Sequence, residues 1–233
     1  MSSGRVFAVE PWVVREPRLD LDRMGQVESV FALSNGHIGL RANLDEGEPH
    51  AMPGTYLNSF YERRPLPYAE GGYGYPESGQ TIINVTNGKL IRLLVEDEPF
   101  DLRYGHLRRH ERVLDLRAGT LSRDVEWTSP AGRVVQVRST RLVSLTQRAV
   151  AAICYEVEVL DAPALVVLQS ELVANEQLPA RNEADPRVEA ALTDPLRAEQ
   201  HGCSGASAYL IHGTRRSGLN VAAAMDHEVH GPE

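Results

Sequence analysis

Leu121-Ser122-Arg123-Asp124-Val125-Glu126-Trp127 is the stretch that decides the fold of this chain of 233 residues. Its odd-numbered positions hold leucine, arginine, valine and tryptophan, while its even-numbered positions hold serine and two carboxylates. This alternation has the period of two that a strand with one buried face requires. Turn residues follow at 129–132, and residues 133–139 then alternate back through Val135 and Val137. The stretch therefore predicts a β-hairpin.

The same pattern continues on both sides of this hairpin. Further strands are predicted at residues 12–14, 54–62, 81–85, 90–95, 100–103, 141–145, 149–160, 165–172, 208–214 and 219–225. Turn signals recur roughly every 8–12 residues and helical periodicity is almost absent, which is typical of two packed antiparallel sheets. The predicted fold class is therefore all-β, with one large antiparallel β-sandwich domain over residues 1–233.

Two Asn-Gly pairs mark expected tight turns, because both residue types tolerate the positive φ of a hairpin turn. Asn35 and Gly36 follow an apolar run at 30–33 and precede residues 38–41. The stretch 28–43 is therefore expected to form a strand, a turn and a returning strand. Asn87 and Gly88 lie between the predicted strands 81–85 and 90–95, and they predict a second hairpin of the same kind.

Two segments depart from the strand pattern. Residues 63–79 place Tyr68, Tyr73 and Tyr75 among three prolines and four glycines. We expect an ordered loop of the kind that meets sugars or a neighbouring domain, although the tyrosines could equally pin the loop to its own domain. Residues 182–205 are polar and contain a weakly helical piece at 188–192, so we expect a surface excursion or partial disorder there.

Composition excludes several classes of function. A net charge of −8 argues against a nucleic-acid-binding protein, because such a protein needs a basic face to displace counterions from phosphate. The two cysteines, Cys154 and Cys203, are too few for a disulfide framework and are expected to be reduced. The chain has no apolar segment of signal-peptide or membrane-spanning length, so we expect a cytoplasmic protein without membrane contact.

Known catalytic motifs are absent from the chain. It contains no nucleophile elbow, phosphate-binding glycine loop, zinc helix or dinucleotide fingerprint. His106 and His110 are four residues apart, but they have no helical pattern and no third ligand, so no metal site is predicted. Glu28 and His37 are titratable residues next to the first turn, and neither has a catalytic partner nearby in the sequence. The spacing of residues nominates no catalytic residue and no cofactor.

Several blocks, in order along the chain, carry a family resemblance. They are residues 28–31, 34–41, 54–58, 60–62, 73–76, 83–85, 114–116 and 170–175. Together they resemble the N-terminal domain of glycoside hydrolase family 65, the family of maltose, trehalose and kojibiose phosphorylases and acid trehalases. The resemblance implies a β-sandwich of the galactose mutarotase type, a supersandwich, that precedes a helical linker and an (α/α)6 barrel.

The resemblance also implies where the chemistry resides. In this family a barrel glutamate is the general acid, and inorganic phosphate is the nucleophile in the phosphorylases, which is inverting chemistry. In the hydrolases a second barrel carboxylate activates water. The resemblance therefore implies that this chain, a sandwich domain truncated at its C-terminus, is a non-catalytic part of a phosphorylase or hydrolase of α-linked glucose disaccharides. Its expected partner is the missing barrel, and a homodimer is also open.

Four aromatic residues are the candidate contacts of this domain, either with the barrel or with carbohydrate: Trp12, Tyr56, Tyr61 and Tyr68. We expect them to form an exposed aromatic patch. Two other functions remain open at this point. The chain could be a stand-alone carbohydrate-binding module that uses its tyrosine loop, or an aldose epimerase. An epimerase would need a glutamate next to His37, His106, His110 or His201.

Overall fold

The computed structural model describes residues 7–66, 71–177 and 193–231, and it is all-β with antiparallel sheets, as predicted. The chain divides into two compact units. The first contains Met1–Gly54 and Lys89–Ser170, and the second contains Thr55–Gly88 and Glu171–Glu233. That these units together form one sandwich domain stays a prediction.

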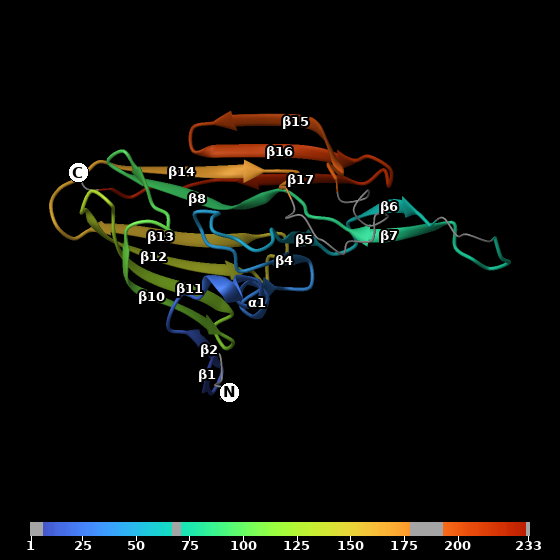
Figure 1. Ribbon diagram of the computed structural model, residues 1–233. Helices are drawn as coiled ribbons and strands as arrows, with labels where there is room; N and C mark the ends of the chain where they lie inside the picture. The colour runs from blue at the N-terminus through green and yellow to red at the C-terminus, as the bar shows by residue number, and fades with distance from the viewer. Residues whose placement is uncertain (1–6, 67–70, 178–192, 232–233) are drawn as a thin grey trace. The chain divides into compact units, whose positions relative to one another are not determined.

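A six-stranded antiparallel sheet is the centre of the first unit (Figure 1). Its order is β1-β2-β10-β11-β12-β13. The strands are β1 Ala8–Glu10, β2 Val13–Glu16, β10 His106–Asp115, β11 Thr120–Thr128, β12 Val134–Val143 and β13 Ala151–Val159. Strands β11 and β12 pair without a shift from Thr120 opposite Leu142 to Thr128 opposite Val134. The hairpin predicted from the deciding stretch is thereby confirmed.

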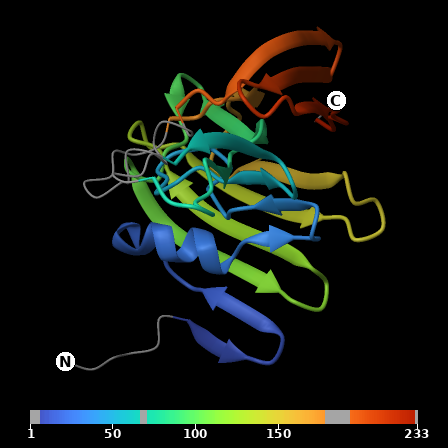
Figure 2. The same ribbon diagram turned by 90° about the vertical axis from the view of Figure 1, so that its right-hand side faces the viewer.

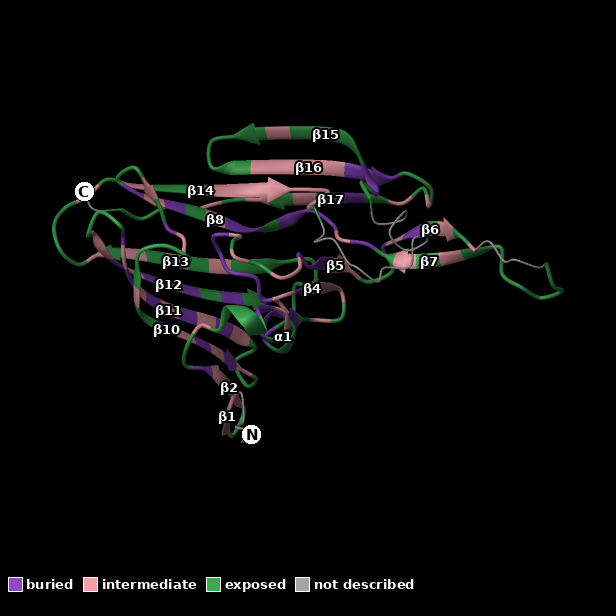
Figure 3. Ribbon diagram, in the orientation of Figure 1, coloured by how far each residue is buried: buried purple, intermediate pink, exposed green. Residues whose placement is uncertain are grey.

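One face of this sheet is buried, and its alternating burial is visible along β11 and β12 in Figure 3. The buried face carries two separate apolar clusters. One cluster contains Val125, Trp127, Val135 and Val137, together with Phe100. The other contains Leu114, Leu121 and Val143 with two residues of the N-terminal segment, Val27 and Phe31. Polar side chains occupy the inward positions between the two clusters.

The segment before the first Asn-Gly pair is helical as far as Val30, so the strand predicted at 30–33 is present only from Leu33. Helix α1 spans Met24–Val30 after a short 3-10 turn at Leu21–Arg23, and Figure 2 shows it beside the sheet. Met24, Val27 and Phe31 are buried at a helical spacing of three and four residues. This spacing is the physical reason for the helix, since it buries all three side chains on one face.

The turn itself is confirmed. Strand β3 covers Leu33–Ser34 and β4 covers Ile38–Leu40, with Leu33 opposite Leu40. Gly36 adopts a φ of +82°, which glycine does without strain. The side-chain oxygen of Asn35 accepts hydrogen bonds from the backbone nitrogens of His37 and Ile38, both 2.9 Å long. The returning strand therefore begins where the sequence predicted.

The hairpin predicted at the second Asn-Gly pair is wrong. Strand β8 runs through the pair as Asn87–Val95, and it belongs to a three-stranded sheet with β9, Glu98–Pro99, and β14, Val166–Val173. Neither Asn87 nor Gly88 has a positive φ. Asn87 is buried, and its amide donates to Glu176 at 2.9 Å. Contacts with surrounding residues hold the backbone of Asn87 and Gly88 in an extended conformation. The strand predicted at 100–103 is also wrong, since that segment turns around the Asp101 carboxylate.

The second unit contains shorter sheets around a small core. Its strands are β5 Thr55–Leu57, β6 Tyr61–Pro65, β7 Ser78–Ile82, β15 Leu196–Ser204, β16 Ser207–Thr214 and β17 Asn220–Met225. The predicted strand 54–62 is interrupted at Ser59, which has a φ of 63°. The polar excursion predicted at 182–205 is corrected in its last third, because β15 pairs there with β16. The helical piece predicted at 188–192 lies outside the described residues.

Candidate functional site

The structure describes three of the four aromatic residues nominated from the sequence, one in the first unit and two in the second. Trp12, in the first unit, is 56% exposed and has the Arg117 guanidinium 5.3 Å from its ring centroid. Tyr56 and Tyr61 belong to the second unit, on β5 and β6, and both are half-buried. Tyr68 lies outside the described residues. A contact role for these four residues therefore stays a prediction.

The most developed polar site is a buried layer on the inner face of the six-stranded sheet. Arg112, Arg123 and Arg141 come from the neighbouring strands β10, β11 and β12, where they occupy inward positions. Arg112 lies directly opposite Arg123 in the ladder, and Ser139 follows on the next strand. All four residues are at most 5% exposed. The sheet therefore sets three cations side by side out of contact with water.

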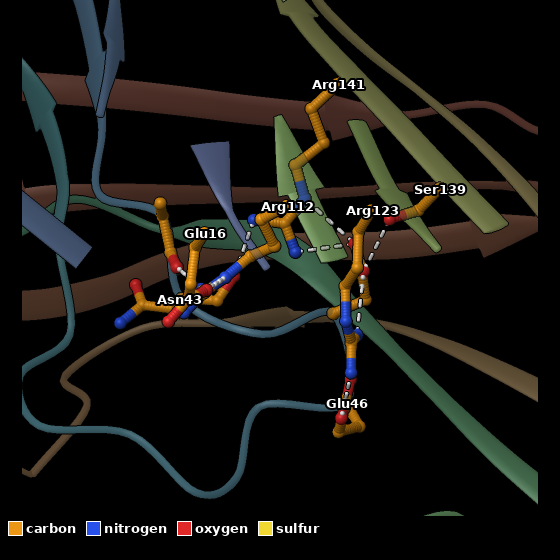
Figure 4. Close-up of polar contacts among 9 residues, drawn as sticks. Glu16, Asn43, Glu46, Arg112, Arg123, Ser139 and Arg141 are labelled. Carbon is orange, nitrogen blue, oxygen red and sulfur yellow. Dashed lines mark hydrogen bonds and ion pairs between the residues drawn. The ribbon is translucent and has the colours of Figure 1, made fainter. Parts of the chain in front are cut away.

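Three carboxylates neutralise these arginines, as Figure 4 shows in part. Asp45 accepts from Arg141 Nε at 2.8 Å and Arg141 Nη2 at 2.6 Å. Glu46 accepts from Arg123 Nη1 at 2.6 Å and Nη2 at 2.7 Å, which is a bidentate pair. Glu16 accepts from Arg112 Nε at 2.5 Å. The layer holds equal numbers of positive and negative groups.

Asp45 is the centre of the layer. Besides its bonds from Arg141, its Oδ2 accepts from Ser139 Oγ at 2.7 Å and from Arg123 Nη1 at 3.2 Å. Burial alone would raise the pKa of Asp45, but the charges of Arg141 and Arg123 and the bonds from Ser139 and Arg141 outweigh it and hold this pKa below its ordinary value. Asp45 therefore stays ionised and joins two of the three strands that carry arginines.

His110 borders the same layer on β10. It is buried, and neither of its ring nitrogens has a hydrogen-bond partner among the described residues. Burial, followed by the nearby charges of Arg123 and Arg112, lowers the pKa of His110 to about 2. The imidazole is therefore neutral at physiological pH. His106 is exposed instead, because the ladder is irregular between Leu107 and Arg109.

Two cavities of the described structure lie in the first unit. A cavity of about 10 Å³ lies within the polar layer, which is the size of a single water molecule. An open depression of about 490 Å³ in the same unit is lined by Glu96, Asp97, Glu98, Arg133 and Asp161. Within the described ranges, no group of three histidine, cysteine or acidic side chains is placed to hold a metal ion. Cys154 and Cys203 are exposed and free.

The sequence signal for the polar layer was present but was interpreted only as strand alternation. Arg123 lies at an inward position of the deciding stretch, between Leu121 and Val125. A buried arginine requires a carboxylate partner, so an inward Arg123 is a signal that could have indicated an internal ion pair. The partners could not be identified, because Asp45 is 96 residues away from Arg141 in the sequence.

These features define the class of protein. It is an all-β protein in which the charged side chains of the buried layer pair with one another and stabilise the fold. The chain belongs to the family described as glycosyl hydrolase family 65, N-terminal domain, whose model matches residues 14–233. No helix in the described part of the chain is long and apolar enough to cross a membrane.

Individual relatives agree with this family. The chain is 62% identical to an uncharacterized glycosyl hydrolase of Mycobacterium leprae, over 100% of this chain and 29% of that protein. It is 33% identical to an alpha,alpha-trehalose phosphorylase of Thermoanaerobacter brockii, over 95% of this chain and 29% of the relative. A solved structure described as a candidate kojibiose phosphorylase from the human microbiome superimposes with a TM-score of 0.81 at 25% identity, covering 95% of this chain and 28% of that one. The chain thus spans less than a third of the length of these relatives.

Proposed function

We propose that this chain is the non-catalytic N-terminal domain of a cytoplasmic phosphorylase that acts on α-linked glucose disaccharides. The observation that carries the proposal is the family match over residues 14–233, together with the 29% of a trehalose phosphorylase that this domain covers. The reacting groups would then lie in the remaining length of the polypeptide. A general acid there would protonate the leaving sugar, while inorganic phosphate attacks the opposite face as co-substrate.

The buried layer supports a structural role for the domain. Ion pairs that are this deeply buried cannot bind a sugar, and they fix the relative positions of three strands. In this proposal the domain is a rigid support that contacts the catalytic part of the same polypeptide. Of the four histidines named for an epimerase, His110 does not fit the role, because it is buried and neither of its ring nitrogens has a hydrogen-bond partner among the described residues.

The isolated chain is expected to release no glucose 1-phosphate from trehalose, maltose or kojibiose in the presence of phosphate. The complete polypeptide encoded by the same reading frame is expected to do so with one of these sugars. The measurement is a coupled assay of glucose 1-phosphate on both proteins at equal concentration. Phosphorolysis by the isolated chain would contradict the proposal.

Calorimetry with the same three disaccharides separates the remaining alternative, a carbohydrate-binding module. The isolated chain is expected to give no heat of binding at millimolar sugar. Binding at this concentration or below would favour a carbohydrate-binding module over a structural domain, and substitution of Tyr56 or Tyr61 would then locate the sugar.

A further inference from the structure

The buried polar layer of the first unit contains two N–H donors that its ion pairs do not use. Arg112 donates from Nε to Glu16 and from Nη1 to the Ala42 oxygen, and its Nη2 has no hydrogen-bond partner among the described residues. Arg123 donates from both terminal nitrogens to carboxylates, and its Nε is likewise without a partner in the described ranges. Both atoms are buried. Because buried donors are almost always paired, these two require an acceptor inside the layer.

Asn43 adds an acceptor to the same layer. Its amide nitrogen donates to the Met52 oxygen at 2.9 Å. A carbonyl oxygen can only accept, so this bond fixes which end of the amide is nitrogen and leaves Oδ1 to bond elsewhere. Oδ1 is buried and has no partner within the part of the chain that the structure describes. The layer therefore lacks a group that can both accept and donate.

One small cavity brings these three side chains together. Its volume is about 10 Å³, and its lining includes Asn43, Arg112 and Arg123. Arg112 and Arg123 lie directly opposite each other on β10 and β11, where the side chains of paired strands are close neighbours. Figure 4 shows the three side chains within the layer. A cavity of this size holds one water-sized molecule, and its polar lining favours a hydrated cavity over a dry one.

The donors and acceptors of the lining identify the occupant. The two arginine N–H groups need an occupant that accepts two hydrogen bonds, and Asn43 Oδ1 needs one that donates. A halide ion accepts but cannot donate, and a metal cation would face two guanidinium groups. The layer also offers no net charge to an ion, because Glu16, Asp45 and Glu46 balance its arginines. A water molecule satisfies all three groups, and about three hydrogen bonds are typical of a buried water.

We propose that this cavity binds one ordered water molecule, which accepts from Arg112 Nη2 and Arg123 Nε and donates to Asn43 Oδ1. The water joins strands β10 and β11 to the segment that follows β4. It also connects the ion pair of Arg112 with Glu16 to the ion pair of Arg123 with Glu46. The water site belongs to the fold of the first unit, so it stands or falls independently of the proposed function.

A high-resolution crystal structure of the complete polypeptide, grown with sodium bromide in place of sodium chloride, tests this site. The expected result is an oxygen-sized peak in the cavity, within about 3.2 Å of Arg112 Nη2, Arg123 Nε and Asn43 Oδ1. No anomalous signal of bromine is expected there. A bromine signal would show an anion site and overturn the proposal. A cavity without density, or a peak that misses any of the three atoms, would overturn it as well.

Two variants test which side chains hold the water. Asn43→Leu replaces the amide by an apolar group of the same shape, so the peak is expected to be lost. Ser139→Ala is the matched control, because Ser139 lines the same cavity but its Oγ already donates to Asp45 at 2.7 Å. The peak is expected to remain in this control. A peak that persists in Asn43→Leu, or that disappears in Ser139→Ala, would contradict the assigned partners. If Asn43→Leu does not fold, the wild-type structure decides alone.

Discussion

Replacement of Asp45 by asparagine is expected to lower the free energy of unfolding by about 3–5 kcal/mol, the usual cost of breaking a buried ion pair on one side. The amide keeps the volume of the side chain but removes the charge that Arg141 and Arg123 face. Arg141 has no other carboxylate within ion-pair distance among the described residues, so its cation would stay buried without a counter-charge. Urea unfolding followed by circular dichroism and tryptophan fluorescence measures the loss.

A matched control is available on the opposite face of the same sheet. Asp124 lies on β11, its side chain is 24% exposed, and it pairs with Arg109 at 3.1 Å. Asp124→Asn is expected to cost less than about 1 kcal/mol, because partly exposed ion pairs contribute little. An Asp45→Asn variant that is no less stable than Asp124→Asn would contradict the assignment of Asp45 as the centre of the layer.

Removal of both partners separates the charge effect from simple loss of contacts. The double variant Asp45→Asn with Arg141→Met is expected to lose less than the sum of the two single variants, because neither unpaired charge then remains buried. Strict additivity of the two losses would mean that Asp45 and Arg141 stabilise the sheet independently.

The strands of the sheet were predictable because their signal is local. Burial along β11 and β12 alternates residue by residue, and the alternation of side-chain types in the sequence reports it directly. The helix at Met24–Val30 was missed because an apolar run of four residues at 30–33 fits a strand equally well. The helical spacing becomes visible only when Met24 and Val27, which precede this run, are considered together with Phe31.

The two Asn-Gly pairs show where local reasoning ends. Both pairs have the same intrinsic tolerance for a turn, yet only Asn35 and Gly36 form one. The Asn35 side chain closes the first turn on its own backbone, and its amide nitrogen also donates to the backbone oxygens of Ser144 and Arg148. The second is held straight by long-range contacts, including the bond from Asn87 to Glu176, which is 89 residues away. Tertiary contacts override the local preference there.

The candidate sites also depend partly on local sequence and partly on the fold. The sequence predicted an ordered tyrosine-rich loop at residues 63–79, but residues 63–65 and 78–79 belong to β6 and β7. Which tyrosine is exposed depends on the fold. Tyr73 is exposed, and it was absent from the four nominated contacts. The partners of the buried arginines could likewise not be identified from the sequence, because the paired residues come from segments more than 70 residues apart.

Acidification from pH 7 to pH 4.5 is expected to lower the free energy of unfolding by about 2–3 kcal/mol through His110 alone. The pKa of His110 in the folded protein is about 2, far below its ordinary value of 6.5. Below pH 6.5 His110 therefore binds a proton in the unfolded chain but not in the folded chain. The stabilising effect of the neutral ring is complete above pH 6.5 and falls by about 1.4 kcal/mol per pH unit below it.

The pH window isolates His110 from the carboxylates. The pKa values of Asp45 and Glu62 lie below their ordinary values of 3.8 and 4.5, so their contributions are lost only at lower pH. His212, whose pKa burial also lowers, acts in the same direction as His110 but is present in every variant. The His110→Gln variant should therefore show a smaller stability loss between pH 7 and pH 4.5 than the wild-type chain does.

The exposed His106 provides the control for this measurement, because His106→Gln is expected to leave the pH dependence unchanged. Urea unfolding at several pH values between 4.5 and 7 gives the slope for each protein. If wild type and His110→Gln lose the same stability over this range, then His110 is protonated in the folded state. Its ring would then have to find a carboxylate within the layer. Because all three carboxylates of the layer already face arginine, that rearrangement would break one of the ion pairs that join the strands.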